Sequence, residues 1–594
     1  MTSYQLLQNI NWDKLPTLDY RQDFFIKIYA EKLNLSNPFF IQARLGTVFS
    51  CANEIKLYIN SYEYTKNSNY IINGIDELIE IVDQDEIIIE FLKDDWGYFK
   101  ESLANIKQKL NNENKFILKN ILNFILSLRD SYEKLLLENL KQSIFSASDL
   151  KQKNRILKNI EKQVSSYISF QLDNGFSNVY LFNRLQHFTR LNNYGDKNFE
   201  QKFDSIFDKI SNERLNFKIY FLISDLKNFR DIRNEIEQRE DVKIYENVTD
   251  LITKIYADKI LKKKDSDKYL EVSVESSDYM AASFTARKIL DKLLDIVFYT
   301  AKVSFKLSDI CIVKTLKDLT PTHEVSILEM SKKTYVETSL YSARYPFLKF
   351  NEIIENLDTI DSSQLVQSLR YVRLTRNINS NEQKILNLWI ALESLFSWKG
   401  DEAILTILLK YVPKIYAEVA LICRLDLALY IIRKCNNKII EDKFNRSLGY
   451  KDVLDIFSDQ NLAKKVYESL NDDLLIYRWC SLNDIFKDKK NIKKQVEKTE
   501  LDVCRQIRRM YFLRNKITHT GFYTDINPIL TLHLMDYIQV CYVAINEALK
   551  ESLQREKRMY SFEELFAVLT IKHNKIFYEN NDAELLNINR LFLL

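Results

Sequence analysis

The sequence predicts a mainly α-helical protein with a small α/β module near its centre. Only 8 of the 594 residues are glycine and 6 are proline, so residues that interrupt helices are scarce. Apolar residues recur at helical spacing before about residue 215 and after about residue 361, whereas short β-branched and aromatic runs gather between them. We therefore expect a helical region at 1–215, an α/β module at 216–360 and a helical bundle at 361–594.

The N-terminal region shows helical periodicity without a motif. Stretches such as 117–132 and 156–170 carry apolar residues three and four positions apart, and short breaks rich in Asn, Asp and Ser separate such stretches. No repeat of constant period occurs. The pattern predicts helices, in a sensor or a scaffold, but does not indicate what this region recognises.

The central module is predicted from three strand-like runs, at 219–223, 270–274 and 310–313. Between the last two we expect a helix with Ser277 or Asp278 as its N-cap. One face of that helix carries Ala282, Ala286, Ile289, Leu293 and Val297. Strands alternating with a helix of this length are typical of a small α/β unit.

Charge and cysteine usage restrict the possible functions. Lys and Arg total 85 against 82 Asp and Glu, and the net charge of +3 gives no global attraction to nucleic acid, so a polyanion site would have to be local. The seven cysteines stand singly with no CxxC pair, which fits reduced thiols and no zinc module. Neither a signal peptide nor an uncharged apolar run of 18 residues is visible, so we expect a soluble, cytoplasmic protein without a membrane partner.

Two helices of the C-terminal bundle place a charged residue where the pattern calls for an apolar one. In 385–396, the advance of about 100° per residue puts Glu393 inside the apolar stripe. In 504–519, the same arithmetic puts Arg514 on the inward face, while Arg505 and Arg509 are expected to point to solvent. Buried unpaired charges are costly, so Glu393 and Arg514 should pair or line a shared cleft.

Periodicity alone explains that pair equally well as an internal salt bridge that fixes helix register. His519 favours a functional site, because it precedes Gly521, the expected helix end, and the negative end of the helix dipole favours a protonated imidazole there. Asn515 could contact a phosphate or orient the histidine, or it could simply bond a backbone carbonyl. The next helix is expected to begin at Asn527 and Pro528.

The runs LNLWIALESLF at 386–396 and FLRNKITHTG at 512–521 resemble the HEPN superfamily, most closely its Apea-like group from bacterial antiphage proteins. The resemblance covers roughly residues 363–555. It implies a metal-independent endoribonuclease of a defence, abortive-infection or toxin system, in which the ribose 2′-OH attacks its own phosphate. It carries Arg514, Asn515 and His519 onto the RNxxxH catalytic motif and matches Glu393 to a facing acidic residue. It also implies a homodimer.

The stretch 487–494, KDKKNIKK, is expected to be a basic loop that contacts RNA through Lys487, Lys489, Lys490, Lys493 and Lys494. The RNA would be tRNA or another cellular RNA, and a phage protein is a possible trigger. No phosphate-binding glycine motif or HExxH occurs, and no metal or cofactor is expected. The other histidines, which are expected to lie packed or at the surface, are His187, His323, His533 and His573.

Two further interpretations stay open at the level of the sequence. The C-terminal domain could be a non-catalytic helical binding module in which Arg514 and Glu393 are only structural. Alternatively, the first 360 residues could form a phage-sensing scaffold to which the C-terminal part responds, a view that combines with the nuclease. Catalysis requires His519 to be reachable from solvent, whereas a structural role allows it to be buried.

Overall fold

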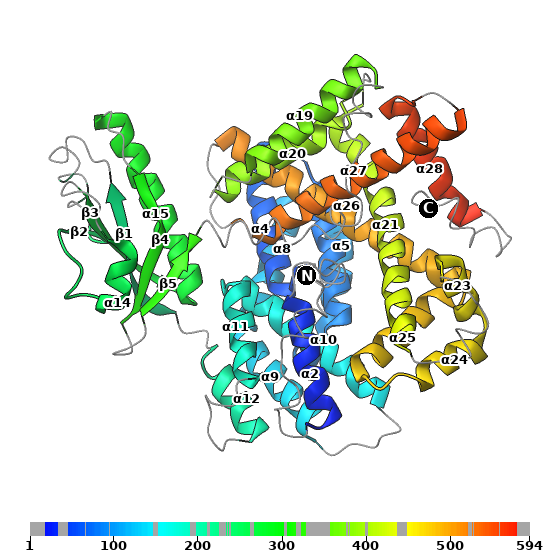
Figure 1. The fold of residues 1–594 in the computed structure, drawn as a ribbon, viewed down its shortest axis with the longest axis horizontal. Coiled ribbons are helices and arrows are strands. Elements are labelled where there is room, and N and C mark those ends of the chain that lie inside the picture. The colour runs from blue at the N-terminus through cyan, green and yellow to red at the C-terminus, as the bar shows by residue number, and fades with distance from the viewer. Residues whose placement is uncertain are drawn as a thin grey trace. The chain divides into compact units, whose positions relative to one another are not determined.

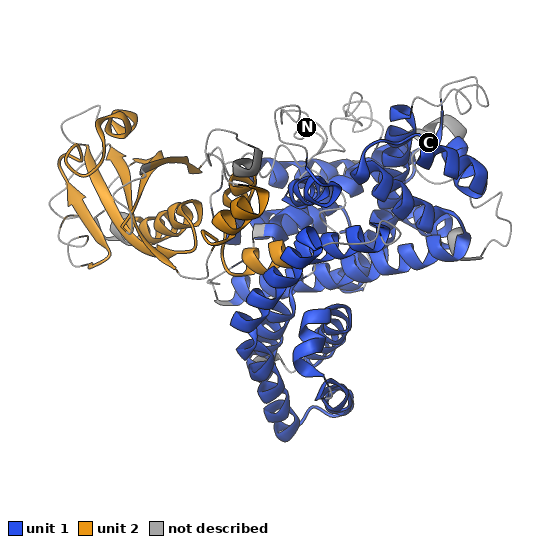
Figure 2. Ribbon diagram, turned by 90° about the horizontal axis from the view of Figure 1, so that it is seen from below, with its two compact units in different colours: residues 1–6, 18–165, 337–594 blue, residues 7–17, 166–336 orange. Residues whose placement is uncertain are grey.

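The fold is taken from a computed structural model of the full chain. The structure describes residues 18–33, 46–65, 67–93, 95–146, 153–189, 198–210, 214–224, 239–261, 267–301, 306–316, 322–327, 357–375, 380–397, 402–435, 448–520, 528–556 and 559–578, together with residues 233, 236, 378 and 526. The chain forms two compact units, one from 18–165 and 337–594 and the other from 166–336 (Figure 2). Residues 18–165 of the first helical part therefore belong to the same unit as the last helical part, whereas residues 166–215 belong to the other unit.

Helices dominate the described residues, and the mainly α fold class is confirmed. The N-terminal helices are α2 (Tyr20–Leu33), α4 (Val48–Thr65), α5 (Asn69–Gln84), α6 (Glu86–Leu92), α7 (Asp95–Gln108), α8 (Asn112–Ser127), α9 (Arg129–Phe145) and α10 (Lys153–Asp173). Polar N-caps start several of them: the Asp85 carboxylate accepts from the backbone N–H groups of Ile87 at 3.0 Å and Ile88 at 3.3 Å. Helices α4 and α5 pack closely at Gly74, where a Cβ atom would lie 2.8 Å from Cγ1 of Ile55.

The C-terminal helices of the same unit run from residue 359 to residue 578 (Figure 1). They are α19 (Thr359–Thr375), α20 (Asn381–Ser394), α21 (Ile404–Lys434), α23 (Tyr450–Ser458), α24 (Gln460–Glu468), α25 (Asp473–Phe486), α26 (Lys489–Thr520), α27 (Pro528–Glu556) and α28 (Phe562–Tyr578). Helix α20 packs on α19, α26 and α27, and α21 packs along α26 and α27. Helix α26 is therefore a central element of the bundle.

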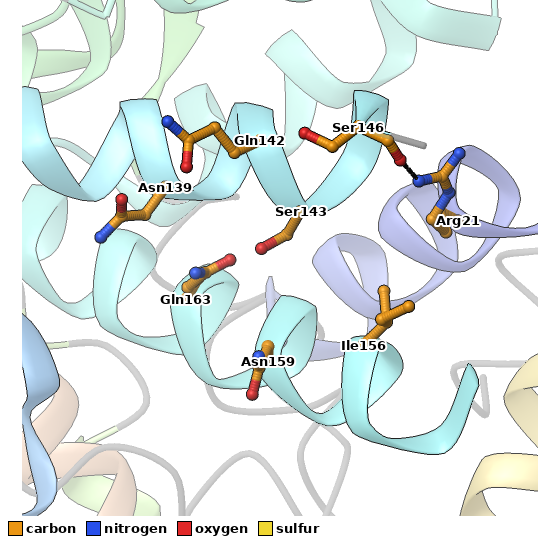
Figure 3. Close-up of a pocket in the computed structure, with 8 residues that line it drawn as sticks. All are labelled: Arg21, Asn139, Gln142, Ser143, Ser146, Ile156, Asn159 and Gln163. Atoms are coloured by element: carbon orange, nitrogen blue, oxygen red, sulfur yellow. Dashed lines mark hydrogen bonds between the residues drawn. The ribbon is translucent and has the colours of Figure 1, made fainter. Parts of the chain in front are cut away.

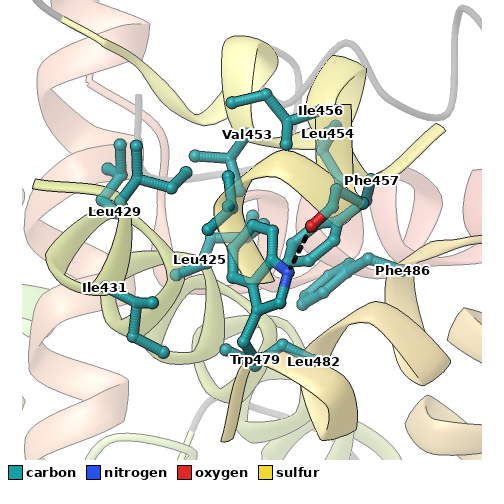
Figure 4. Packing of buried hydrophobic residues seen from close by; sticks show 14 of the residues in the cluster. Leu425, Leu429, Ile431, Val453, Leu454, Ile456, Phe457, Trp479, Leu482 and Phe486 are labelled. Atoms are coloured by element: carbon teal, nitrogen blue, oxygen red, sulfur yellow. Dashed lines mark hydrogen bonds between the residues drawn. The ribbon is translucent and has the colours of Figure 1, made fainter. Parts of the chain in front are cut away.

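Aromatic packing holds α23, α24 and α25 against α21 (Figure 4). The ring of Phe457 stacks on Trp479 at 4.6 Å and on Phe486 at 5.6 Å between centroids. The buried indole of Trp479 donates from Nε1 to the carbonyl of Ala463 at 3.0 Å, so its polar atom is satisfied inside the core. This packing fixes α25, the helix that precedes α26.

Several expected helix boundaries are confirmed. The capping box before α28 is present, because the Ser561 N–H donates to Glu564 at 3.1 Å and the Glu564 N–H donates to the Ser561 hydroxyl at 3.2 Å. Helix α27 begins at Pro528, as predicted, whereas Gly521 and Asn527 lie outside the described residues. Residues 529–549 of α27 are the one described segment long and apolar enough to cross a membrane. However, 83% of its apolar 18-residue stretch is buried, which fits the core helix of a soluble protein.

The second unit contains a five-stranded antiparallel sheet of order β2-β3-β1-β4-β5. Its elements are α11 (Asn178–Thr189), α12 (Phe199–Phe207), β1 (Leu215–Ser224), β2 (Val242–Tyr245), α14 (Lys254–Ala257), η4 (Asp258–Ile260), β3 (Lys268–Ser276), α15 (Tyr279–Ala301), β4 (Lys306–Thr315) and β5 (Thr322–Ser326). The three predicted strands and the helix are present, and the Asp278 carboxylate caps α15 by accepting from the Met280 N–H at 2.8 Å. The short strands β2 and β5 were not predicted.

The sheet buries both faces by the alternation of side chains along each strand. Ile219 and Phe221 of β1 join the core under α15, whereas Tyr220 between them joins a second core with α14 and η4. The predicted inward residues Ala282 and Ala286 of α15 are fully buried.

Candidate functional site

Helix α26 carries the RNxxxH sequence in its last two turns and the predicted basic stretch in its first turns. The expectation of a basic loop is therefore wrong: Lys487 follows the end of α25, and Lys489, Lys490, Lys493 and Lys494 lie on α26. The Asp488 carboxylate accepts from the Asn491 N–H at 2.8 Å, an N-cap contact that starts the helix. Lysine is also a good helix former, and the stretch has no Gly or Pro to interrupt it.

The lysines and the motif lie at opposite ends of one helix. At about 1.5 Å per residue, the first lysines of α26 are about 45 Å along the axis from His519. Lys487 pairs with Asp484 at 2.9 Å. These five lysines therefore do not line the candidate site within one chain, and only an extended or folded RNA could contact both.

Helix α20 supplies the acidic residue of the site. Ser380 caps this helix, its hydroxyl accepting from the Gln383 N–H at 3.2 Å, and Glu393 lies in the last turn. Trp389, one turn earlier, is fully buried and contacts the ring of Tyr511 on α26 at 5.6 Å. The apolar stripe of α20 thus packs on α26 and carries Glu393 towards it.

Glu393 and Arg514 approach each other, as the angular placement predicted. Arg514 Nη2 lies 3.7 Å from Glu393 Oε2, with side-chain exposures of 30% and 18%. Arg514 Nη1 donates to Oδ1 of Asn515 at 3.0 Å, so the amide oxygen of Asn515 contacts the guanidinium. The ion pair is longer than a hydrogen bond and partly exposed to solvent, which leaves the guanidinium accessible to an anion.

His519 is exposed in the last turn of α26, which ends at Thr520. Arg514 and His519 are about 7.5 Å apart along the helix axis and about 140° apart around it. Within the described part of the chain, His519 makes no hydrogen bond or ion pair. The imidazole is therefore reachable from solvent, which is the condition that catalysis requires.

Arg505 and Arg509 do not point to solvent as the sequence predicted. They are 8% and 7% exposed and pair with carboxylates of α4 and α5. Arg509 donates from Nε to Glu54 at 2.6 Å and from Nη2 to Glu77 at 2.7 Å, and Arg505 Nη2 lies 2.8 Å from Glu80. This polar face of α26 is buried because the polar faces of α4 and α5 cover it.

Another charged cluster lies at His573, which bridges Glu418 at 3.1 Å and Glu500 at 2.7 Å. Burial lowers the pKa of His573, but the hydrogen bonds and charges of the two glutamates outweigh it and raise this pKa to about 9. His573 is 1% exposed, so it is a packed histidine. Among the residues that the structure describes, no group of three His, Cys, Asp or Glu side chains is arranged to hold a metal ion.

A pocket of about 270 Å³ lies between α2, α9 and α10 (Figure 3). Its lining is Arg21, Asn139, Gln142, Ser143, Ser146, Ile156, Asn159 and Gln163. Arg21 is already engaged, with Nε 2.8 Å from Asp19 and Nη1 donating to the Ser146 carbonyl. The lining holds no carboxylate, histidine or cysteine, so acid–base or nucleophilic chemistry has no obvious residue there.

Comparison of the chain with protein-family models, curated proteins and solved structures gives no match. The site must therefore be judged by its own chemistry. A planar guanidinium can grip a phosphate in two places, and an exposed imidazole can exchange a proton at neutral pH. Arg514, Asn515 and His519 on one helix end, with Glu393 beside Arg514, combine both capacities.

Proposed function

We propose that this chain is a metal-independent endoribonuclease of the HEPN type, which acts in the bacterial cytoplasm in antiphage defence or as a toxin. The observation that carries the proposal is the pairing of Arg514 with Glu393 at the end of α26 that also bears the exposed His519. If Arg514 and Glu393 were paired only for packing, the site would not require the accessible imidazole of His519 later on the same helix. The N-terminal helical region would serve as the sensor of a trigger such as a phage protein.

The proposed reaction is transfer of a phosphodiester within RNA. The ribose 2′-oxygen bonds to the adjacent phosphorus and the bond from phosphorus to the 5′-oxygen breaks, which leaves a cyclic phosphate and a 5′-hydroxyl. His519 accepts the proton of the 2′-OH or donates a proton to the 5′-oxygen. Arg514 stabilises the extra negative charge of the phosphorane, and Asn515 holds the guanidinium through the 3.0 Å contact.

Glu393 limits the freedom of Arg514 without occupying its hydrogen-bonding face fully, since the two groups are 3.7 Å apart. We expect a homodimer in which two motifs face each other, so that one histidine acts as base while the other acts as acid. The substrate would be tRNA or another cellular RNA long enough to reach both the site and the lysines at the start of α26.

The decisive experiment incubates purified full-length protein with total RNA, with and without EDTA, and analyses the new RNA ends. We expect cleavage that survives chelation and leaves cyclic phosphate ends, since the proposed chemistry uses only side chains. Loss of cleavage in EDTA that magnesium or manganese restores would contradict the mechanism. Absence of cleavage, or equal cleavage by the wild type and the His519→Ala variant, would favour the non-catalytic binding module.

A further inference from the structure

The contacts between α26 and the N-terminal helices end directly beside the candidate site. Arg505, Arg509 and Phe512 follow one another at spacings of four and three, so they share one face of α26. The ring of Phe512 packs edge-to-face against Tyr58 of α4 at 4.8 Å and Tyr70 of α5 at 5.3 Å between ring centroids. Arg514 follows two residues later.

The charged part of this contact is buried and geometrically tight. Arg509 is held by two carboxylates from two different helices, Glu54 of α4 and Glu77 of α5. Arg505 is held by Glu80, one turn after Glu77 on α5. Two ion pairs from α5 and one from α4 therefore fix α26 both along its axis and in rotation, because each arginine can satisfy its partners in only one register.

The same arrangement recurs on α25. Arg478, 5% exposed, donates from Nη2 to Glu161 of α10 at 2.8 Å and also pairs with Glu31 of α2. Burial alone would raise the pKa of Glu161, but the charges of Arg478 and Lys32 hold it well below its usual range. In these buried pairs the arginines come from the C-terminal helices and the carboxylates from the N-terminal ones. The carboxylates are those of Glu31, Glu54, Glu77, Glu80 and Glu161.

We infer that α4 and α5 position the candidate active site through Arg509 and Arg505. This inference rests on the proposed function. Arg509 and Arg514 are about 7.5 Å apart along a continuous helix and about 140° apart around it, so the clamped face and the face towards Glu393 move together. A rotation or slide of α26 at Arg509 changes the distance between Arg514 and Glu393. Arg509, Glu54 and Glu77 are thus positioning residues that touch no substrate.

The test replaces Glu54 and Glu77 by glutamine together, which removes both negative charges and keeps the shape of the side chains. The matched control is Glu86→Gln on α6, whose ion pair with Lys162 is exposed. Rates of RNA cleavage are measured alongside the ¹³Cε1 NMR signal of His519. The chain has five histidines, so this signal can be assigned from the His519→Ala variant.

We expect the double variant to lose kcat by about 100-fold, the size associated with a misplacement of about 1 Å. KM should stay within about twofold, because substrate contacts are not removed. The His519 signal should shift in the double variant and stay in place in the Glu86→Gln control. Unchanged kcat with an unchanged signal, or an increase in kcat, overturns the inference.

The NMR signal separates this inference from the proposed function. If the wild-type chain does not cleave RNA, a shifted His519 signal still supports the coupling between α4, α5 and the end of α26, and an unchanged signal overturns it. If the double variant does not fold, Glu80→Gln decides by the same two measurements. The Glu80 side chain is 31% exposed, so its replacement is milder.

Discussion

Replacing Arg514 by lysine separates the role of its charge from the role of its shape. The substitution keeps the positive charge near Glu393 and removes the planar fork that can hold two oxygens of a phosphate. If Arg514 only balances a carboxylate, lysine should substitute well. If it grips a phosphorane, lysine should fail.

The structure sets the expected cost in stability. The ion pair spans 3.7 Å with side-chain exposures of 30% and 18%, so it is partly hydrated. Pairs of this kind contribute up to about 1 kcal/mol. Removing one side of a fully buried pair would cost more, roughly 3–5 kcal/mol. We therefore expect Arg514→Lys to lower the free energy of unfolding by less than about 1 kcal/mol.

The expected loss in catalysis is larger. Removing one preorganised donor from a developing oxyanion lowers kcat by about 10²–10³-fold. The assay is single-turnover cleavage of a labelled RNA, with thermal unfolding of the same samples. Arg508→Lys on the same helix is the matched control, because Arg508 is also partly exposed. A folded Arg514→Lys protein that cleaves RNA at the wild-type rate would refute a grip on phosphate in two places.

His519→Ala should abolish RNA cleavage. Because the side chain is exposed, the substitution should change the free energy of unfolding by no more than about 0.5 kcal/mol in denaturant titrations. Cleavage by this variant at the wild-type rate would remove His519 from the mechanism. Gly74→Ala should destabilise by about 1–3 kcal/mol, since the new Cβ would lie 2.8 Å from Ile55, and an unchanged melting temperature would argue against this close approach of α4 and α5. Burial raises the pKa of Asp536 to about 7, so the folded state retains its proton and stability falls as pH rises from about 4 to about 7. Asp536→Asn should therefore gain up to about 4 kcal/mol over the wild type by pH 8 and almost nothing at pH 4, and a difference independent of pH would contradict the assignment.

The sequence was sufficient for features that depend on neighbours along the chain. The inward direction of Arg514 and Glu393, the N-cap at Asp278 and the capping box at Ser561 follow from spacing and from local hydrogen bonds. These signals act within about one helical turn, so one sequence contains them completely. The catalytic role of the RNxxxH residues stays a prediction.

One error concerned a local signal, and the others arose where a distant segment decides the outcome. The stretch after Lys487 looked like a loop because of its charge, yet charge is compatible with the exposed side of a helix, and Asp488 supplies the cap. Strands β2 and β5 are four and five residues long and are stabilised by pairing with β3 and β4. Their own residues gave too short a pattern to predict.

Arg505 and Arg509 show why the polar face of a helix need not face water. Periodicity gives the direction of each side chain relative to its neighbours on α26, but it does not say what lies in that direction. Here the covering surface is itself polar, with Glu77 and Glu80 three residues apart on α5. An arginine pair at i, i+4 and a glutamate pair at i, i+3 are each ordinary on a solvated helix. They form a buried clamp only because the arginines of α26 contact glutamates that lie more than 400 residues earlier in the sequence. The same contact connects the region expected to sense a trigger to α26, the helix that bears His519 in its last turn, so the clamp is one physical route between them.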